Sequence, residues 1–72
     1  MTLKERFGIT VRRLRVEAGY SQEAFADRAK VHRTYMGTVK RGETNLTLEN
    51  IDKLAHALGL KMWQLLREMD DI

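Results

Sequence analysis

The chain has 72 residues, a formal net charge of +3 at pH 7, 43% hydrophobic residues and no cysteine. This composition predicts one folded domain with a small core, and it excludes a disordered chain, a disulfide framework and a thiolate metal site. No apolar run is long enough to span a membrane, and the first residues lack the apolar segment of a secretion signal, so we expect a cytoplasmic protein without a membrane partner.

Positive charge is unevenly distributed along the chain. Residues 1–20 carry five basic and two acidic side chains, residues 21–46 carry five and three, and residues 47–72 carry three and five. From Lys30 to Arg41 there are four basic and no acidic side chains. This pattern favours one surface that faces phosphate and a second surface with another use, although an ordinary solvated face would produce the same pattern.

The first predicted helix lies between Thr2, a favourable N-cap, and Gly19, a residue typical of the position just after a helix. Gly8 lies inside it and weakens the local helical preference. The apolar residues recur at spacings of four and three, as one face of a helix requires. This face consists of Leu3, Phe7, Val11, Leu14 and Ala18.

Two short helices joined by a tight turn are predicted next. The first begins at Ser21, a favourable N-cap, and runs to about Ala29, and the second covers about His32 to Lys40 and stops at Gly42. Apolar residues occur at the core spacings of a helix-turn-helix, at Ala26, Val31, Met36 and Val39.

The opposite face of the second short helix is polar. Its positions fall within one broad stripe, because an α-helix turns about 100° per residue. The stripe consists of Arg33, Thr34, Gly37, Thr38 and Arg41. These residues fit the floor of a DNA major groove, and the missing side chain of Gly37 would let the backbone approach the bases.

The remaining residues predict a polar loop and two more helices. The loop covers residues 42–47, and Thr47 caps a fourth helix that Gly59 closes. A fifth helix covers Lys61 to about Met69, and no strand pattern occurs, so the predicted fold class is all-α with five helices. The predicted apolar face of the fourth helix is Leu48, Ile51, Leu54, Ala55 and Leu58.

A motif of a known family spans these elements. The pattern L-x-x-x-x-G-x-S-Q-x-x-x-A, formed by Leu14, Gly19, Ser21, Gln22 and Ala26, resembles the Cro/phage-repressor type of helix-turn-helix proteins, the XRE family. The match extends through the predicted core residues and the run that ends at residue 59, so it covers about residues 7–60. The resemblance implies a five-helix, lambda-repressor-like fold with its helix-turn-helix at residues 21–41.

Two segments, 32–37 and 41–48, are also similar to controller proteins of restriction–modification systems, which are short dimeric members of the same family. The family resemblance assigns roles to individual residues. The base-reading positions are matched by Arg33, Thr34 and Thr38. Positions that contact the DNA backbone are matched by Ser21, Gln22, Arg41, Thr44 and Asn45.

The side-chain chemistry is consistent with these roles and adds three backbone candidates. The planar donor fork of Arg33 fits the O6 and N7 atoms of guanine, and a threonine offers a hydroxyl and a methyl group to a base edge. His32 at a helix start and Lys40 at a helix end are both placed to meet phosphate. Tyr35 would either direct its hydroxyl at a phosphate or close the edge of the core.

The chain departs from the family pattern at two positions. Lys30 occupies the turn position that the family usually fills with glycine, where a left-handed conformation costs about 1 kcal/mol. Either a phosphate contact of Lys30 offsets this cost, or the turn has another shape. Lys40 replaces a glutamate that in the family commonly pairs with the arginine that matches Arg15. Arg15 therefore needs another partner, or faces solvent or phosphate.

Residues 56–72 are the predicted dimerisation segment. We expect a two-fold interface formed by an apolar strip, with His56 at its rim. The strip consists of Leu60, Trp63, Leu66 and Met69. The alternative is that these four apolar side chains fold back onto the first and fourth helices and that two subunits meet only on DNA.

The sequence thus predicts a transcriptional regulator that binds a palindromic operator in double-stranded DNA as a homodimer. We expect no enzyme activity, cofactor or small-molecule ligand, and no metal site, since the two histidines, His32 and His56, lack ligand spacing. Two alternatives remain: the antitoxin of a toxin–antitoxin pair, which would also bind a toxin, and a protein-interaction module that kept the fold. A neighbouring gene for a restriction enzyme or a toxin would distinguish them.

Overall fold

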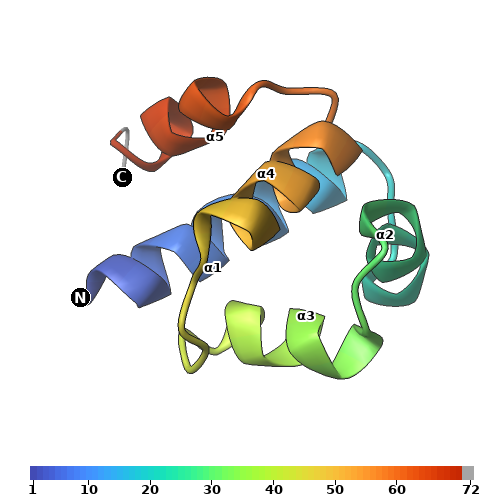
Figure 1. Cartoon of the computed structure of the whole chain (residues 1–72), viewed down its shortest axis with the longest axis horizontal. Helices are drawn as coiled ribbons and strands as arrows, with labels where there is room; N and C mark the ends of the chain where they lie inside the picture. Colours follow the sequence, from blue (N-terminus) through green and yellow to red (C-terminus); the bar gives the residue numbers. More distant parts are fainter. Residues whose placement is uncertain (71–72) are drawn as a thin grey trace.

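The computed structural model describes residues 1–70, which contain five helices and no strand (Figure 1). The predicted all-α class is confirmed. The helices are α1 (Leu3–Glu17), α2 (Gln22–Ala29), α3 (Arg33–Lys40), α4 (Leu48–Ala57) and α5 (Met62–Met69). None of the helices in this part of the chain has the length and apolar character needed to cross a membrane.

The predicted helix starts are confirmed by their hydrogen bonds. The side-chain oxygens of Thr2, Ser21 and Thr47 each accept a hydrogen bond at 3.1 Å from the backbone N–H three residues further on. Such bonds satisfy N–H groups that the first turn of a helix leaves without partners. Gly19 and Gly59 follow the ends of α1 and α4 with positive φ angles of 85° and 74°, as the sequence indicated.

The core is formed by residues from all five helices. α1 packs against α3 and α5, and α2 packs against α3 and α4. The largest fully buried hydrophobic side chains are Phe7, Val11, Phe25, Val39, Leu54 and Leu65. The polar sides of the helices therefore point outward, and the outer sides of α3 and α5 belong to different parts of the surface (Figure 1).

Three residues of the predicted core faces are exposed instead. Leu3 and Leu48 are each the first residue of their helix, so they lie beyond the part that packs on the core, and both are exposed. Ala18 is also exposed, because it lies at the C-cap where α1 ends.

Gly8 has a packing role, whereas the sequence indicated only that it weakens the helical preference of α1. A Cβ atom at this position would overlap the backbone carbonyl oxygen of Val39, and it would lie 3.1 Å from that of Lys40. The absence of a side chain at Gly8 therefore lets α1 and α3 cross with their backbones close together. This crossing fixes how α3 is held against the rest of the protein.

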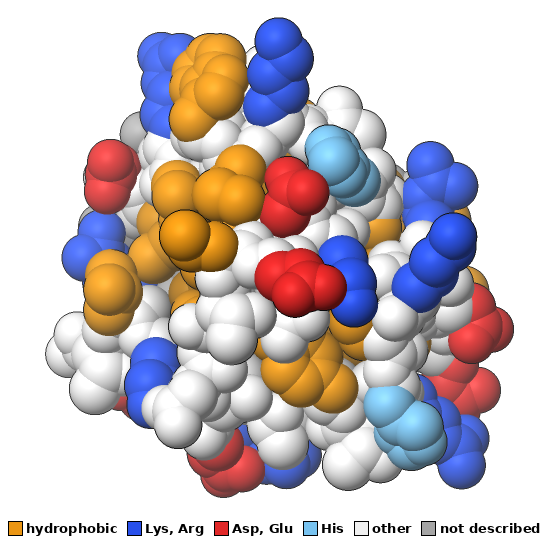
Figure 2. Space-filling view, viewed as in Figure 1, with side chains coloured by type: hydrophobic (Ala, Val, Ile, Leu, Met, Phe, Trp, Pro, Cys, Tyr) orange, Lys and Arg blue, Asp and Glu red, His pale blue; other side chains and the backbone are white. Residues whose placement is uncertain are grey.

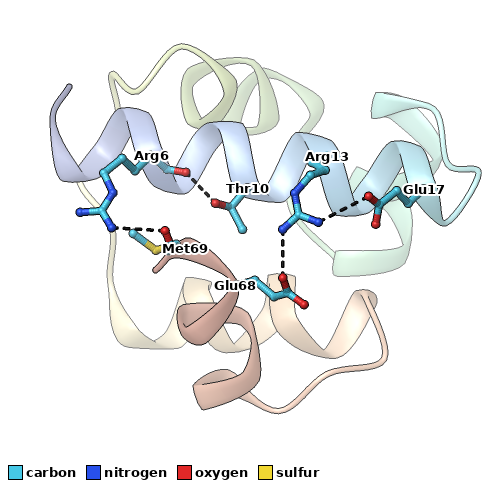
Figure 3. Close-up of polar contacts among 6 residues, drawn as sticks. All are labelled: Arg6, Thr10, Arg13, Glu17, Glu68 and Met69. Carbon is cyan, nitrogen blue, oxygen red and sulfur yellow. Dashed lines mark hydrogen bonds and ion pairs between the residues drawn. The ribbon is translucent and has the colours of Figure 1, made fainter. Parts of the chain in front are cut away.

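Polar contacts connect α1 with α5 (Figure 3). Arg13 donates to Glu68 of α5 at 3.0 Å and lies 3.4 Å from Glu17 of α1. Arg6 donates to the carbonyl oxygen of Met69 at 3.2 Å, at the end of α5. These contacts satisfy a free carbonyl group at a helix end and hold α5 in place.

Candidate nucleic-acid interface

α2 and α3 are joined by a turn in which Lys30 has left-handed angles, φ 59° and ψ 41°. Lys30 is the sole non-glycine residue with positive φ among the described residues. Of the two possibilities for this turn, the structure has the left-handed one, which costs a non-glycine residue about 1 kcal/mol. The N–H of Val31 donates to the carbonyl oxygen of Ala26 at 3.0 Å and closes the turn.

α3 has an inner apolar side and an outer polar side. Met36 and Val39 are buried and hold the helix on the core. The predicted base-reading residues Arg33 and Thr34 are exposed, and Thr38 is half-buried. The structure therefore brings the predicted reading face together on one accessible surface.

The two arginines of this surface are each held by a carboxylate. Arg33 Nη1 lies 3.3 Å from Glu23 Oε1 of α2, and Arg41 Nε lies 2.8 Å from Glu43 Oε1. All four side chains are more than half exposed, and exposed pairs of this kind contribute at most about 1 kcal/mol. The pairs orient both guanidinium groups without preventing exchange for another anion. The sequence did not reveal the pair of Arg33 with Glu23, because these residues lie on different helices.

His32 is the N-cap of α3. Its ring atom Nδ1 accepts a hydrogen bond from the backbone N–H of Thr34 at 3.0 Å. In this arrangement Nδ1 carries no proton, so Nε2 carries the N–H of the ring. The exposed ring of His32 can therefore offer a donor at the start of α3.

The hydroxyl of Thr38 is already committed inside its own helix. It donates to the backbone carbonyl oxygen of Tyr35 at 2.7 Å. A hydroxyl has one proton and two lone pairs, so Thr38 retains only acceptor capacity and its methyl group for another partner. In this rotamer it can contact a thymine methyl or accept from an amino group, but it cannot donate to guanine.

Tyr35 does not present its hydroxyl to solvent. The oxygen is buried and makes no hydrogen bond with the described residues, and the ring packs against the core. Burial raises the pKa of Tyr35 above its ordinary value, and the neighbouring Asn50 side chain acts in the opposite direction. Of the two roles predicted for Tyr35, the phosphate contact is therefore wrong, because the side chain closes the edge of the core.

Gly37 lies near two potential phosphate donors. A Cβ atom at Gly37 would be 3.2 Å from Arg41 Nη1 and 3.9 Å from Gln22 Nε2. The structure thus brings the amide of Gln22 and the guanidinium of Arg41 close to the half-buried Gly37 of α3. Ser21 also lies at the start of α2, where its hydroxyl is engaged as the N-cap.

The loop after α3 is tied to α1. Asn45 Oδ1 accepts a hydrogen bond from Lys4 Nζ at 2.8 Å, and Thr44 is half-buried. Arg15, whose partner the sequence left open, donates to the carbonyl oxygen of Tyr20 at 2.6 Å. It therefore braces the connection between α1 and α2.

The predicted dimerisation strip is divided by the structure. Met69 is 6% exposed and belongs to the core, so it can contribute only a small area to an interface, although it lines the same hollow as Trp63 and Leu66. Trp63 and Leu66 are 57% and 37% exposed, and together with Leu3 they line an open hollow of about 400 Å³. Figure 2 shows hydrophobic side chains gathered over α5 and between α5 and α4.

The other members of that prediction lie around this surface. Leu60 is half-buried against the core, and His56 is exposed with its Nδ1 atom 3.6 Å from Asp52 Oδ2. Residues 71 and 72 of the predicted dimerisation segment lie outside the described residues. Because Trp63 and Leu66 are exposed, the four apolar side chains of the strip do not all fold back onto their own subunit. That two subunits meet only on DNA stays a prediction.

Comparisons with known proteins agree with this architecture. A family model described as helix-turn-helix matches residues 11–62. The chain is 41% identical over 61 residues to control protein C.BamHI of Bacillus amyloliquefaciens, covering 83% of this chain and 75% of that protein. It is also 41% identical over 66 residues to control protein C.SmaI of Serratia marcescens, covering 92% and 79% of the two chains.

A solved structure shows the same fold. The restriction–modification controller protein C.AhdI of Aeromonas hydrophila superposes with a TM-score of 0.82 and 42% identity, covering 86% of this chain and 94% of that one. Both resemblances noted in the sequence, to the XRE type and to controller proteins, are confirmed. The chain belongs to the helix-turn-helix family of DNA-binding transcriptional regulators.

Proposed function

We propose that this protein is a homodimeric regulator that binds a palindromic operator and controls the genes of a restriction–modification system. The observation that carries the proposal is the outer side of α3, where Arg33, Thr34 and Thr38 share an accessible face while Met36 and Val39 hold the helix on the core. An α-helix with such a face fits the major groove.

In this proposal, Arg33 reads a guanine and the two threonines read neighbouring base edges. The residues around α3 that contact the DNA backbone set the register and orientation of the helix on the duplex. These are Ser21, Gln22, His32, Lys40, Arg41, Thr44 and Asn45.

The dimer forms through the exposed apolar side of α5, with Trp63 and Leu66 at its centre and Leu60 and His56 at its edge. Aromatic side chains are enriched at such interfaces. A two-fold axis there holds the two α3 helices about 34–36 Å apart, which is one turn of DNA. The protein then acts in the cytoplasm by occupying its operator.

The control of restriction–modification genes rests on the relatives, several of which are named as controller proteins. The chain spans 75% of C.BamHI and 93% of C.MunI of Mycoplasma sp., so the likeness covers most of their length. We expect the operator to lie upstream of such genes.

The test is to select duplexes from a random pool and to titrate the selected and random duplexes at two salt concentrations. We expect tighter binding of the selected duplex and a log–log salt slope of several units, since each neutralised phosphate contributes about 0.9. Equal affinity for both duplexes would refute the proposed regulator.

A further inference from the structure

A hollow with basic walls lies where the end of α2 meets the end of α4. It is open to solvent, has a volume of about 380 Å³, and is lined in part by the buried residues Ala29 and Ala57. Its other walls are formed by Arg28, Lys30, Lys53 and His56. Among residues 1–70, no acidic side chain lines this hollow. His56 lies 3.6 Å from the carboxylate of Asp52, so the other three side chains supply its positive charge.

The guanidinium group of Arg28 is fixed at one wall of the hollow. Its Nε atom donates to the carbonyl oxygen of Ala57 at 2.8 Å, and its Cζ atom lies 5.3 Å from the centre of the Tyr20 ring. The first contact satisfies a carbonyl group at the end of α4, and the second is a cation–π interaction. Because the hydrogen bond uses Nε, the exposed side chain still offers its Nη groups, in a fixed position, to another acceptor.

Lys30 holds a strained backbone conformation beside this arginine. Glycine adopts its left-handed φ of 59° without strain, whereas the same conformation destabilises a protein with lysine there. The turn is closed by backbone hydrogen bonds, so it does not itself require an ammonium group. Strained residues are concentrated at functional sites, and the exposed side chain of Lys30 belongs to the wall of the hollow.

The hollow is separate from the outer side of α3. In Figure 1, α3 lies along the bottom of the view, and the ends of α2 and α4 lie above it at the right. Figure 2 shows Lys and Arg side chains in that region. The acidic residues Glu23 and Asp27 of α2 line a different hollow, together with His32 and Arg33 at the start of α3. A duplex held by the outer side of α3 would therefore leave the basic hollow open to another molecule.

The chemistry of the hollow fits a protein segment that carries several carboxylates. Small-molecule sites usually enclose most of their ligand, and this hollow is too open to do so. Carboxylates form strong, charge-assisted hydrogen bonds with arginine and lysine. Complementary charge across an interface also steers the encounter of two proteins and selects the partner. One acidic segment could contact Arg28, Lys30 and Lys53 together.

We propose that this hollow binds an acidic segment of another protein while the regulator occupies its DNA site. The inference adds a protein partner to the proposed function, and its reference to DNA-bound regulator rests on that function. The surface neither reads bases nor joins two subunits, apart from His56, which also lies at the edge of the proposed dimer surface.

The first test titrates a hexaglutamate peptide with blocked ends into the isotopically labelled protein at physiological ionic strength. We expect the largest changes in amide chemical shift at residues 28–30 and 53–57. Lys30→Gly and Lys53→Ala should each weaken the affinity about two- to five-fold, the effect of losing one exposed ion pair. Lys30→Gly should not lower the melting temperature, because it removes the backbone strain.

Arg12→Ala is the matched control, since Arg12 is an exposed residue of α1 and its loss changes the net charge equally. It should leave the affinity for hexaglutamate unchanged. If Arg12→Ala weakens the peptide as much as Lys30→Gly does, or if the largest shifts lie on α3, the peptide responds to overall charge or to another surface. Either result would overturn the docking site.

The second test repeats the titration on the protein bound to its selected duplex. The peptide should shift the same residues, and Lys30→Gly should keep the affinity for the duplex. If the duplex abolishes peptide binding, or if Lys30→Gly binds the duplex more weakly, the basic residues contact DNA and the docking site is wrong. The regulator itself is tested separately, by the preference of the wild type for selected over random duplex.

Inorganic tripolyphosphate distinguishes an acidic protein segment from a small phosphorylated ligand. The hollow should bind hexaglutamate more tightly, because the longer chain reaches all of its basic side chains. Tighter binding of tripolyphosphate at the same residues would assign the hollow to a small phosphorylated ligand and overturn the proposal.

Discussion

α3 and α5 are helices of the same length, but the outer side of α3 is polar and the outer side of α5 is apolar. Each has eight residues, and each is held on the core by two buried side chains, Met36 and Val39 in α3 and Leu65 and Met69 in α5. The outer side of α3 carries an arginine and hydroxyl groups, whereas that of α5 carries the largest exposed aromatic side chain, Trp63.

This difference shows that the anchoring of a helix and its function are specified by different residues. The two buried side chains of each helix place no requirement on its outer side, which water alone could cover. α3 instead offers charge and hydrogen-bonding groups, which suit DNA, and α5 offers apolar area, which suits a protein partner. The comparison predicts that substitutions on the outer side of α3 leave dimerisation intact, and that substitutions on the outer side of α5 leave base recognition by α3 intact.

The largest expected effect is on dimerisation. Trp63→Ala should weaken the association of two subunits by at least about 2 kcal/mol, because an aromatic residue at the centre of an interface contributes strongly. The fold should persist, since Trp63 is more than half exposed. Sedimentation equilibrium without DNA measures the effect.

Leu48→Ala is the control for this variant, since Leu48 is an exposed apolar residue of α4 outside the α5 surface. It should leave the association unchanged. If the wild type sediments as a monomer at micromolar concentration, or if Trp63→Ala associates as strongly as the wild type, α5 is not the interface.

The next effect, taken for a single half-site, is expected on base reading. Arg33→Ala should cost about 1–3 kcal/mol per half-site and relax the preference at one base pair, because it removes a bidentate contact. Gln22→Ala should weaken binding to all sequences more evenly, since it removes a phosphate contact. Binding-site selection with each variant measures both effects, and an unchanged preferred sequence for Arg33→Ala would contradict the role of Arg33.

The smallest expected effect concerns Thr38. Its hydroxyl proton is used within the helix, so the methyl group should carry its contribution to sequence preference. Thr38→Val keeps a methyl group at that place and should retain the preference, whereas Thr38→Ser should lose about 1 kcal/mol, close to the value of one buried methylene.

Replacing each thymine of the half-site by uracil checks this, because uracil lacks the methyl group. One replacement should weaken the wild type and Thr38→Val but leave Thr38→Ser unaffected. If Thr38→Val loses the preference while Thr38→Ser keeps it, the hydroxyl and not the methyl group is read.

The sequence predicted the helices well because their signals are local. The N-caps at Thr2, Ser21 and Thr47 and the glycines after α1 and α4 act within one turn of the chain. The position of the turn at Lys30 was also predicted from the motif, whereas its left-handed shape was one of two possibilities. These features depend little on the rest of the fold.

One residue of the inner side of α5, Met69, was placed in the interface strip, although the sequence contained the signal for its burial. Met69 was grouped with Trp63 and Leu66 in a strip of spacing three, which drifts around a helix. The spacing of three and four through Met62, Leu65 and Met69 marks the side that packs on the core, and the structure buries Leu65 and Met69.

Contacts between helices could not be read from the sequence. The pairing of Arg33 with Glu23 and the close crossing at Gly8 each depend on how separate helices are placed. The buried hydroxyl of Tyr35 is a similar case, since its two possible positions differ only in tertiary packing.

The central claim is that α3 reads DNA while α5 joins two subunits. Its most direct test is the affinity of the protein for selected operators with altered spacing between their half-sites. Insertion of about five base pairs turns one half-site to the opposite side of the duplex. The account predicts that the affinity then falls to that of a single half-site, because the α5 interface fixes the separation of the two α3 helices. Equal affinity at every spacing would contradict it, since the two subunits would then bind independently.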